Sequence, residues 1–305
     1  MRMGLKPTSL AGWCLFVLLL FLSAFYVVSG HLLSMPGAWG PRFSIALTES
    51  VAFFGGAVLL RFLAKDRKLN RRLRPVSRVY TSFALLTAVT AALGLFLLNV
   101  GLAHIVREPY RGLDALYPML SRTVDVPAGL VIATLVVIPA LVQEVFLRGA
   151  LFSLFEKQGT AAALVLSTIS MPMLYVYPSA APLVLVIGFL CALETYYTNS
   201  VWPAVLTHLL CRLALYGGDL LYASDALAGR TVIVVAVAVV LFLLFLFSLL
   251  RSCEGLLRDG LLEHFQKGPE RTAENLWASF RTLGFLLFLL LYITRLVMIL
   301  LGMWR

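Results

Sequence analysis

The sequence predicts an all-α, polytopic membrane protein, a bundle of about eight or nine transmembrane helices. Hydrophobic residues make up 61% of the chain and charged residues only 13%, whereas a soluble domain carries about 25% charged residues. Apolar runs of about twenty residues, long enough to cross a bilayer as a helix, recur along the whole sequence. Neither a soluble segment nor a repeat of fixed period is evident, so we expect one domain built from three regions.

Residues 1–126 form the first region, which contains three apolar runs of spanning length. We expect these spans at about Leu10–Val28, Ile45–Leu63 and Tyr80–Val106. A cleaved secretory signal is the alternative for the first run. That run exceeds the apolar stretch of about 7–15 residues typical of a signal, so we expect it to be retained. Glu49 and Arg61 lie near the ends of the second span, where we expect both to reach the membrane surface.

A basic loop at residues 64–78 separates the second span from the third. It contains the run KDRKLNRRLR from residue 65 to residue 74, followed by Arg78. Cytoplasmic loops are enriched in Lys and Arg, so this loop and the N-terminus are predicted to lie in the cytoplasm. A patch that binds anionic lipid or a partner is the alternative function of the loop. Such loops also explain the net charge of +10, and we expect no nucleic-acid partner.

Residues 127–216 form the second region, in which we expect four more spans. They lie at about 127–156, 161–177, 183–197 and 202–216. Pro172 is inside the second of these spans and predicts a kink, because proline cannot donate the backbone hydrogen bond of a helix interior.

Residues 217–305 form the third region. We expect an external loop at 217–230 and an eighth span at Thr231–Leu250. Leucines at helical spacing then predict an amphipathic segment at 251–281 that lies flat on the cytoplasmic surface. A last span at about Leu283–Met303 contains Arg295, which must find a partner inside the bundle or extend to the surface. Asp219 is expected to be a solvated acid of the external loop.

Polar side chains inside the spans of the second region identify the candidate site. Glu144 and Arg148 are four residues apart on one helical face and can pair, while Gln143 faces a neighbouring direction. Ionisable side chains are costly within a membrane and normally face other helices or a functional cavity. Further polar residues lie on the following helices, at Tyr175, Glu194, Trp202, His208 and Arg212.

These segments resemble the CPBP (Abi) family of CAAX-protease and bacteriocin-processing intramembrane proteases. The family's first motif, Glu-Glu-x-x-x-Arg-Gly, matches residues 143–149, where Glu144, Arg148 and Gly149 fit. Its third motif, Thr-Gly-Ser-(Leu/Ile)-Trp-x-x-(Ile/Val)-x-x-His, matches residues 198–208. The resemblance covers residues 128–215 and implies a CAAX-protease-like core at 127–216. The activity that it implies is an intramembrane endopeptidase of the CAAX prenyl protease type.

The sequence departs from the family at the positions that the resemblance implies are catalytic. Gln143 replaces the Glu taken to activate water, Tyr175 replaces the His of the second motif, and Arg212 replaces the Asn that follows His208. His208 is retained. An amide cannot act as a general base at neutral pH. In an active variant, Glu144 would be the base, Tyr175 a proton donor and Arg212 the stabiliser of an oxyanion.

We expect the remaining charges to hold the core together. Arg148, Glu194 and Trp202 are predicted to be structural, and Arg212 is predicted to reach Glu144 or Glu194, because an unpaired buried guanidinium is costly. His208 and Cys211 have a spacing that suits two metal ligands. No second pair of ligands is evident, so we expect no metal and no other cofactor.

The expected function is therefore that of a pseudoprotease, a membrane scaffold or regulator that binds a membrane protein or a lipidated peptide without cutting it. An active intramembrane endopeptidase with altered catalytic residues is one alternative. A transporter or export-complex subunit is the other. Membrane lipids are the remaining expected partners. No organelle-targeting segment is evident, so we expect the cytoplasmic membrane of a bacterium.

Overall fold

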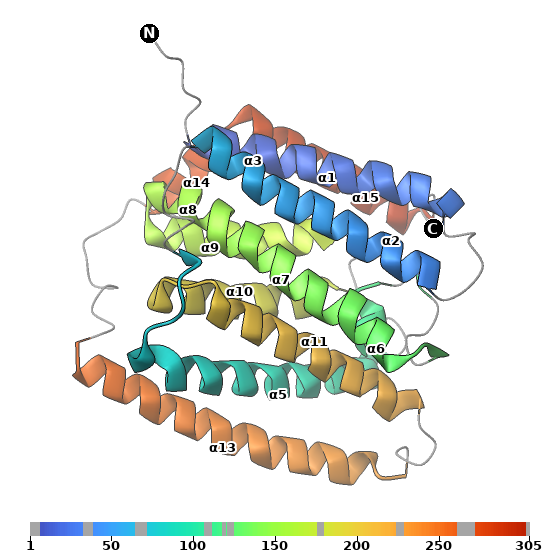
Figure 1. Cartoon of the computed structure of the whole chain (residues 1–305), viewed down its shortest axis with the longest axis vertical. Helices are drawn as coiled ribbons and strands as arrows, with labels where there is room; N and C mark the ends of the chain where they lie inside the picture. The colour runs from blue at the N-terminus through green and yellow to red at the C-terminus, as the bar shows by residue number, and fades with distance from the viewer. Residues whose placement is uncertain are drawn as a thin grey trace.

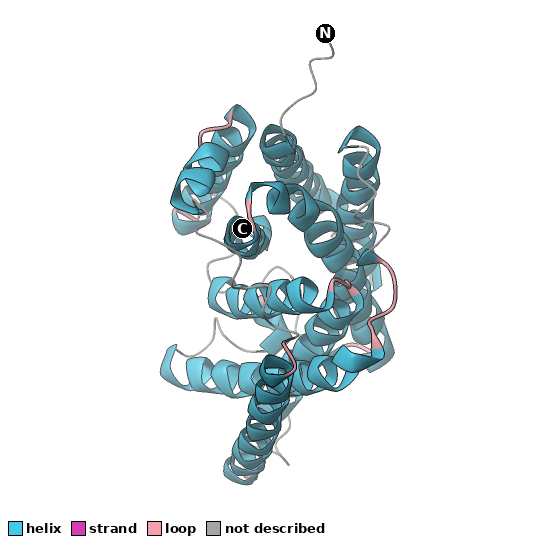
Figure 2. Cartoon of the chain, turned by 90° about the vertical axis from the view of Figure 1, so that its left-hand side faces the viewer, coloured by secondary structure: helices cyan, strands magenta, loops and turns pink. Residues whose placement is uncertain are grey.

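The computed structural model describes residues 7–32, 39–64, 72–106, 112–117, 120, 125–175, 180–223, 229–260 and 272–302. Within these residues all regular elements are helical, as Figure 2 shows. Eight of the helical segments are long and apolar enough to cross a membrane. The prediction of an all-α, polytopic membrane bundle is thus confirmed.

The α-helices are α1 (Pro7–Leu32), α2 (Trp39–Glu49), α3 (Gly55–Ala64), α5 (Thr81–Val106), α6 (Ala128–Val131), α7 (Ile138–Glu144), α8 (Phe152–Phe155), α9 (Thr160–Tyr175), α10 (Ala181–Thr198), α11 (Trp202–Ala223), α13 (Thr231–Arg258), α14 (Thr272–Phe280) and α15 (Leu283–Leu300). Short 3-10 turns lie at Arg78–Tyr80, Gly112–Ala115 and Glu156–Gln158. A π-helical stretch at Ser50–Phe54 joins α2 to α3, and two more join α6, α7 and α8 into one long helix.

Two helices continue beyond the ends expected from the sequence. α11 runs on to Ala223 through residues expected to form an external loop, because its last turns pack on α5 and on the 112–115 turn. α13 continues to Arg258, where Leu256 packs beside Phe83. The first part of the expected amphipathic segment is therefore the end of a span. Residues 261–271 of that segment lie outside the described residues.

The helices run alongside one another, with α1 and α15 at the top of Figure 1 and α13 at the bottom. The fourth span and helices α9, α10 and α11 lie between them and form the interior. α9 has 16 residues and is shorter than the eight spanning segments. Arg295 on α15 is 1% exposed, so it faces into the bundle and does not extend to the surface.

Two glycines allow α1 and α15 to pack at close range. A methyl group added at Gly12 would lie 2.6 Å from the backbone nitrogen of Phe285, and one at Gly284 would meet the backbone of Trp13. Small residues let membrane helices approach until their backbones touch. This contact joins the first span to the last.

We expect Gly284→Ala to destabilise the protein by about 1–3 kcal/mol, because the added methyl group meets backbone that cannot move aside. Gly101→Ala on α5 is the matched control, since nothing lies within 4 Å of its added methyl group. Alanine is favoured over glycine within a helix, so the control should keep or raise stability. Thermal melting in detergent compares the two variants, and equal behaviour would contradict the close packing.

Candidate functional site

The polar centre lies where the fourth span departs from α-helical geometry. α7 ends at Glu144, between π-helical stretches at Ile132–Val137 (η6) and Val145–Leu151 (η7). Such stretches are rare and occur frequently at functional sites. Gln143, Glu144 and Arg148 are each 1% exposed or less. All three side chains therefore face the interior of the bundle.

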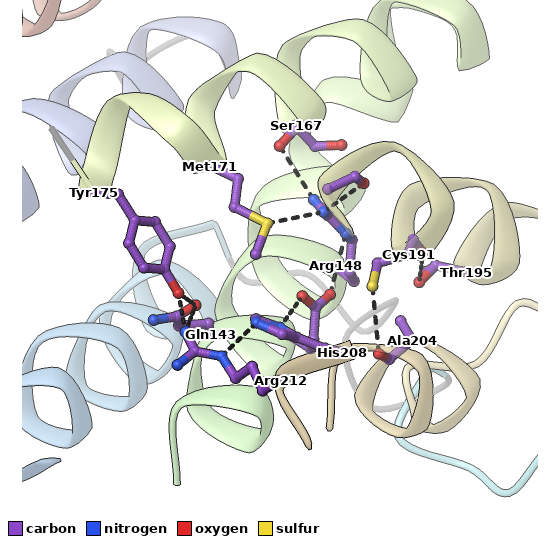
Figure 3. A network of polar contacts seen from close by, with 12 residues as sticks. Gln143, Arg148, Ser167, Met171, Tyr175, Cys191, Thr195, Ala204, His208 and Arg212 are labelled. Atoms are coloured by element: carbon purple, nitrogen blue, oxygen red, sulfur yellow. Dashed lines mark hydrogen bonds and ion pairs between the residues drawn. The ribbon is translucent and has the colours of Figure 1, made fainter. Parts of the chain in front are cut away.

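Arg148 ties three helices together. Its Nε atom lies 3.2 Å from Oε2 of Glu144, so the expected pair is present as a charge contact, although its N–H does not align with the oxygen. Its Nη atoms donate hydrogen bonds to the backbone oxygens of Ser167 on α9 (3.1 Å) and Gly188 on α10 (2.7 Å). The sulfur of Met171 lies 3.6 Å away. Figure 3 shows this arginine between the helices that it joins.

His208 stands between Glu144 and Arg212, with both ring nitrogens in use. Figure 3 shows His208 beside Arg212. Its Nε2 atom lies 2.8 Å from Nε of Arg212, and its Nδ1 atom lies 2.8 Å from Oε1 of Glu144. The guanidinium can only donate, so Nε2 must be the acceptor. This assigns the proton of a neutral imidazole to Nδ1, which donates it to the carboxylate. The ring therefore has no free nitrogen with which to bind a further group.

The guanidinium of Arg212 fills the middle of the polar centre. Besides His208, its hydrogen-bond acceptors are the Tyr117 hydroxyl (2.9 Å), the Leu135 backbone oxygen (2.6 Å), Oε1 of Gln143 (3.4 Å) and the Tyr175 hydroxyl. Arginine has five N–H groups in a fixed planar arrangement. Every nitrogen of this side chain has at least one acceptor, so burial leaves none of them unsatisfied.

The anionic counterpart of Arg212 differs from the sequence prediction. Within the described residues Arg212 makes no direct ion pair with Glu144 or Glu194; it reaches Glu144 only through His208. Glu49 on α2 takes this role instead. Its Oε1 atom accepts a hydrogen bond from Tyr117 (3.1 Å) and its Oε2 atom accepts one from Gln143 (3.1 Å). Both donors also contact Arg212, so each links the two charges.

The expectation that Glu49 reaches the membrane surface is wrong. Its side chain is 5% exposed. α2 begins at Trp39 and not near Ile45, so Glu49 lies ten residues, or about 15 Å, inside the helical segment. The sequence did contain a sign of this role, because Glu49 is a lone carboxylate in an apolar run. Such a residue within a membrane span is a functional candidate by default.

The loop before the fourth span places Tyr117 in the centre, and sequence reasoning missed this residue. Gly112 has a φ of +52° and donates its N–H to Asn99 (3.1 Å), while the N–H of Leu113 donates to Asp219 (2.9 Å). Asp219 is 5% exposed, which corrects the expectation of a solvated loop acid. Burial raises the pKa of Tyr117 well above its ordinary value, so its hydroxyl stays protonated and can donate to a carboxylate.

The third motif fastens the basic loop to the bundle. Trp202 donates its indole N–H to the backbone oxygen of Leu73 (2.9 Å) and is 44% exposed, so it lies at the surface and not in the predicted core position. Arg72 from the same loop is 2% exposed. It forms an ion pair with Glu156 (3.1 Å) and donates hydrogen bonds to Ser153 and to the backbone of Arg148 (both 3.1 Å). Part of the basic loop is therefore structural.

Glu194 is a buried carboxylate apart from this network. It is 0% exposed, and neither of its oxygens has a hydrogen-bond donor among the described residues. Thr207 on α11 and the Glu144 carboxylate are the side chains that influence it electrostatically. A buried carboxyl without a cationic partner takes up a proton because the ionised form is costly, so its contribution to the core must differ from that of Glu144, which pairs with Arg148.

We expect Glu194→Gln to leave the melting temperature unchanged or to raise it, because a buried carboxyl without a cationic partner is held in its neutral form, which an amide resembles in size and polarity. Glu144→Gln is the matched comparison and should lower stability, since it removes the ion pair with Arg148. Melting of both variants in the same detergent tests the contrast. A fall for Glu194→Gln as large as that for Glu144→Gln would show that Glu194 has a cationic partner.

The centre leaves little empty space. A pocket of about 10 Å³ is lined by Leu22, Glu49, Phe53, Gln143, Leu174 and Tyr175, and this is room for about one water molecule. Within the described part of the chain, no group of three His, Cys, Asp or Glu side chains could hold a metal ion, and Cys211 adds no such group to His208. The arrangement can bind a water molecule but has no room for a peptide.

Comparison with protein families identifies the segment that carries this site. Residues 126–214 match the family described as Rce1-like, type II CAAX prenyl endopeptidase. Neither the curated proteins nor the solved structures contain a match to the chain. The matched segment includes six of the residues of the centre, at positions 143, 144, 148, 175, 208 and 212. The segment that carries the centre is thus similar to the Rce1-like family, which agrees with the resemblance to the CPBP family seen in the sequence.

Proposed function

We propose that this protein is a catalytically inactive, Rce1-like membrane protein that acts by binding a membrane partner. The observation that carries the proposal is the position of Arg212. Its guanidinium occupies the middle of the centre and donates to His208, Tyr117, Tyr175 and Gln143. A scissile peptide bond held among these groups would need the same space.

Each group that could take part in hydrolysis is already engaged. Gln143 is an amide and cannot be the base. Glu144 is held by Arg148 and His208, and both nitrogens of His208 are in use. The Tyr175 hydroxyl donates to Gln143 (2.7 Å). Loss of one oxyanion donor alone costs about 100-fold to 1000-fold in rate, so loss of the base together with the donors supports inactivity.

An apolar groove beside the centre supports a role in binding. It lies between α1 and the helix that runs from Val51 to Leu63, has a volume of about 260 Å³, and is lined by side chains such as Leu18, Phe21 and Leu59. Leu22 and Phe53, which line the water-sized pocket, follow the groove residues Leu18 and Ala52 on the same helices. A transmembrane helix or a lipidated tail of a partner has the chemistry that this groove accepts.

The orientation in the membrane belongs to the proposal. The end of α3, the start of α5, the end of α13 and the start of α15 lie at the end of the bundle where α1 begins, at the left of Figure 1. Exposed basic residues belong to or adjoin these helix ends, at Arg61, Arg78, Arg258 and Arg281. Cytoplasmic ends of spans are enriched in Lys and Arg. This distribution supports a cytoplasmic N-terminus, and the proposed location is the cytoplasmic membrane of a bacterium.

The proposal is tested with purified protein reconstituted in liposomes and incubated with prenylated and unmodified membrane peptides, beside an active type II CAAX prenyl endopeptidase. We expect no cleavage by the wild-type protein or by His208→Ala, and recovery of a stoichiometric membrane partner after cross-linking in native membranes. Wild-type cleavage that disappears in His208→Ala would overturn the proposal. Solute flux into the liposomes would favour a transporter subunit instead.

The alternative is an active endopeptidase whose base has moved to another helix. The observation that favours it is the Glu49 carboxylate, which lies beside the water-sized pocket together with Tyr175. A carboxylate next to a bound water is the arrangement that general-base hydrolysis needs. In this case cleavage would be lost in Glu49→Gln as well as in His208→Ala, and would persist in Glu194→Gln.

A further inference from the structure

A second groove lies far from the polar centre, between α14 and the start of α15. Its volume is about 550 Å³, and its lining is almost entirely apolar: Ala273, Leu276, Trp277, Phe280, Leu286 and Leu289, with Arg281 as its charged member. Pockets of about 300–1,000 Å³ accommodate small organic ligands. The groove is therefore large enough for part of a lipid chain.

The attachment of α14 directs its apolar side into this groove. Asn275 donates a hydrogen bond to the backbone oxygen of Gln158 (2.5 Å), and the Ser279 hydroxyl donates to the side chain of the same glutamine. These polar contacts hold one face of the nine-residue helix against the end of the fourth span. The opposite face, with Trp277 at 64% exposure, is left for the groove.

The position of the groove matches the boundary between lipid and water. α14 lies at the end of the bundle where α1 begins and the fourth span ends (Figure 1), and it is too short to cross a bilayer. Tryptophan is enriched at this level of membrane proteins. Leu286 and Leu290 on α15 are 50% and 62% exposed, so the groove continues onto a surface that faces the acyl chains.

Arg281 supplies a positive charge at the mouth of the groove. Its side chain is exposed, and its guanidinium lies 5.8 Å from the centre of the Trp277 ring. Arginine binds phosphate with two parallel hydrogen bonds. The acidic residue of α14, Glu274, is in the first turn, about 10 Å along the helix from Arg281. A phosphate at the mouth would therefore meet a cation and an aromatic ring.

We propose that this groove binds one anionic phospholipid, with an acyl chain along Leu286 and Leu289 and the phosphate on Arg281. Charge complementarity selects the headgroup, because the described lining of the groove offers a guanidinium and no carboxylate. The apolar lining requires a chain attached to the phosphate. This site is independent of the inactive centre and of the groove proposed for a membrane partner.

The test is native mass spectrometry of the full chain in detergent, with equal amounts of phosphatidylglycerol and phosphatidylcholine that carry the same acyl chains. We expect one phosphatidylglycerol to be retained in preference to phosphatidylcholine. Arg281→Ala should reduce the retained fraction about fivefold, the effect of one basic residue at a membrane surface. Excess inorganic phosphate should not displace the lipid, because it has no chain to fill the groove.

Arg251→Ala is the matched control. Arg251 is also exposed and lies 5.4 Å from the ring of Phe247, but it belongs to α13 and borders neither groove. A second variant, Ala273→Trp, fills the groove from an exposed position and should remove both lipids without changing the melting temperature. Equal retention of the two lipids, equal loss in Arg281→Ala and Arg251→Ala, or retention in Ala273→Trp would each overturn the proposal.

Discussion

Arg212→Ala is expected to lower the free energy of unfolding by about 3–5 kcal/mol, because it leaves the buried Glu49 carboxylate without a cation. Glu49→Ala should cost a similar amount, since it leaves Arg212 without an anion. The two changes should not add: the double variant is expected to be more stable than their sum by about 0.5–3 kcal/mol. Chemical or thermal unfolding in one detergent measures all three.

The carboxylate whose substitution is energetically coupled to Arg212→Ala distinguishes this arrangement from the one expected from sequence. Glu144 contacts Arg212 only through His208, so the cycle between Arg212→Ala and Glu144→Ala should give a smaller coupling than the cycle with Glu49. Glu194→Gln combined with Arg212→Ala serves as the additive control. Independent effects of Arg212 and Glu49 would contradict the charge link through Tyr117 and Gln143.

Arg148→Ala is expected to cost about 3–5 kcal/mol as well, for a different reason. It removes the cation from Glu144 and also leaves the backbone oxygens of Ser167 and Gly188 without their donor. Arg148→Lys keeps the charge but cannot make several hydrogen bonds in one plane. We expect the lysine variant to recover only part of the loss, as measured by melting and by the yield of folded protein after extraction.

The control for this prediction is Arg258→Ala on the exposed end of α13. Arg258 pairs with Glu254 at 3.3 Å in the same i,i+4 arrangement, but its side chain is 77% exposed. Exposed ion pairs contribute only about 0–1 kcal/mol. Both arginines pair with a glutamate at the same helical spacing, but Arg148 is buried and contacts more helices. The loss of stability should therefore be larger for Arg148→Ala than for Arg258→Ala. Similar losses in both variants would show that Arg148 does not join the helices.

Sequence alone determined the membrane class and the positions of most spans. An apolar run of about twenty residues that crosses a bilayer forms a helix, because a helix satisfies all of its backbone hydrogen bonds within one segment and the bilayer supplies no water. The Glu144–Arg148 pair was also predictable, since helical periodicity fixes which residues share a face. The ends of α11 and α13 were not, because packing against α5 extended both helices past the polar residues that mark a loop in sequence.

Tertiary structure decided the composition of the polar centre. Glu49 lies 94 residues from Gln143 in sequence, and Tyr117 reaches the centre from a loop held by Asn99 and Asp219. Periodicity describes one helix at a time, so it cannot indicate which carboxylate on another helix will face a buried guanidinium. The resemblance to the CPBP family implies that Gln143 stands where the family has its base. Only the packing of α2 against α7 showed that a carboxylate lies in the centre, linked to Arg212 through Tyr117 and Gln143.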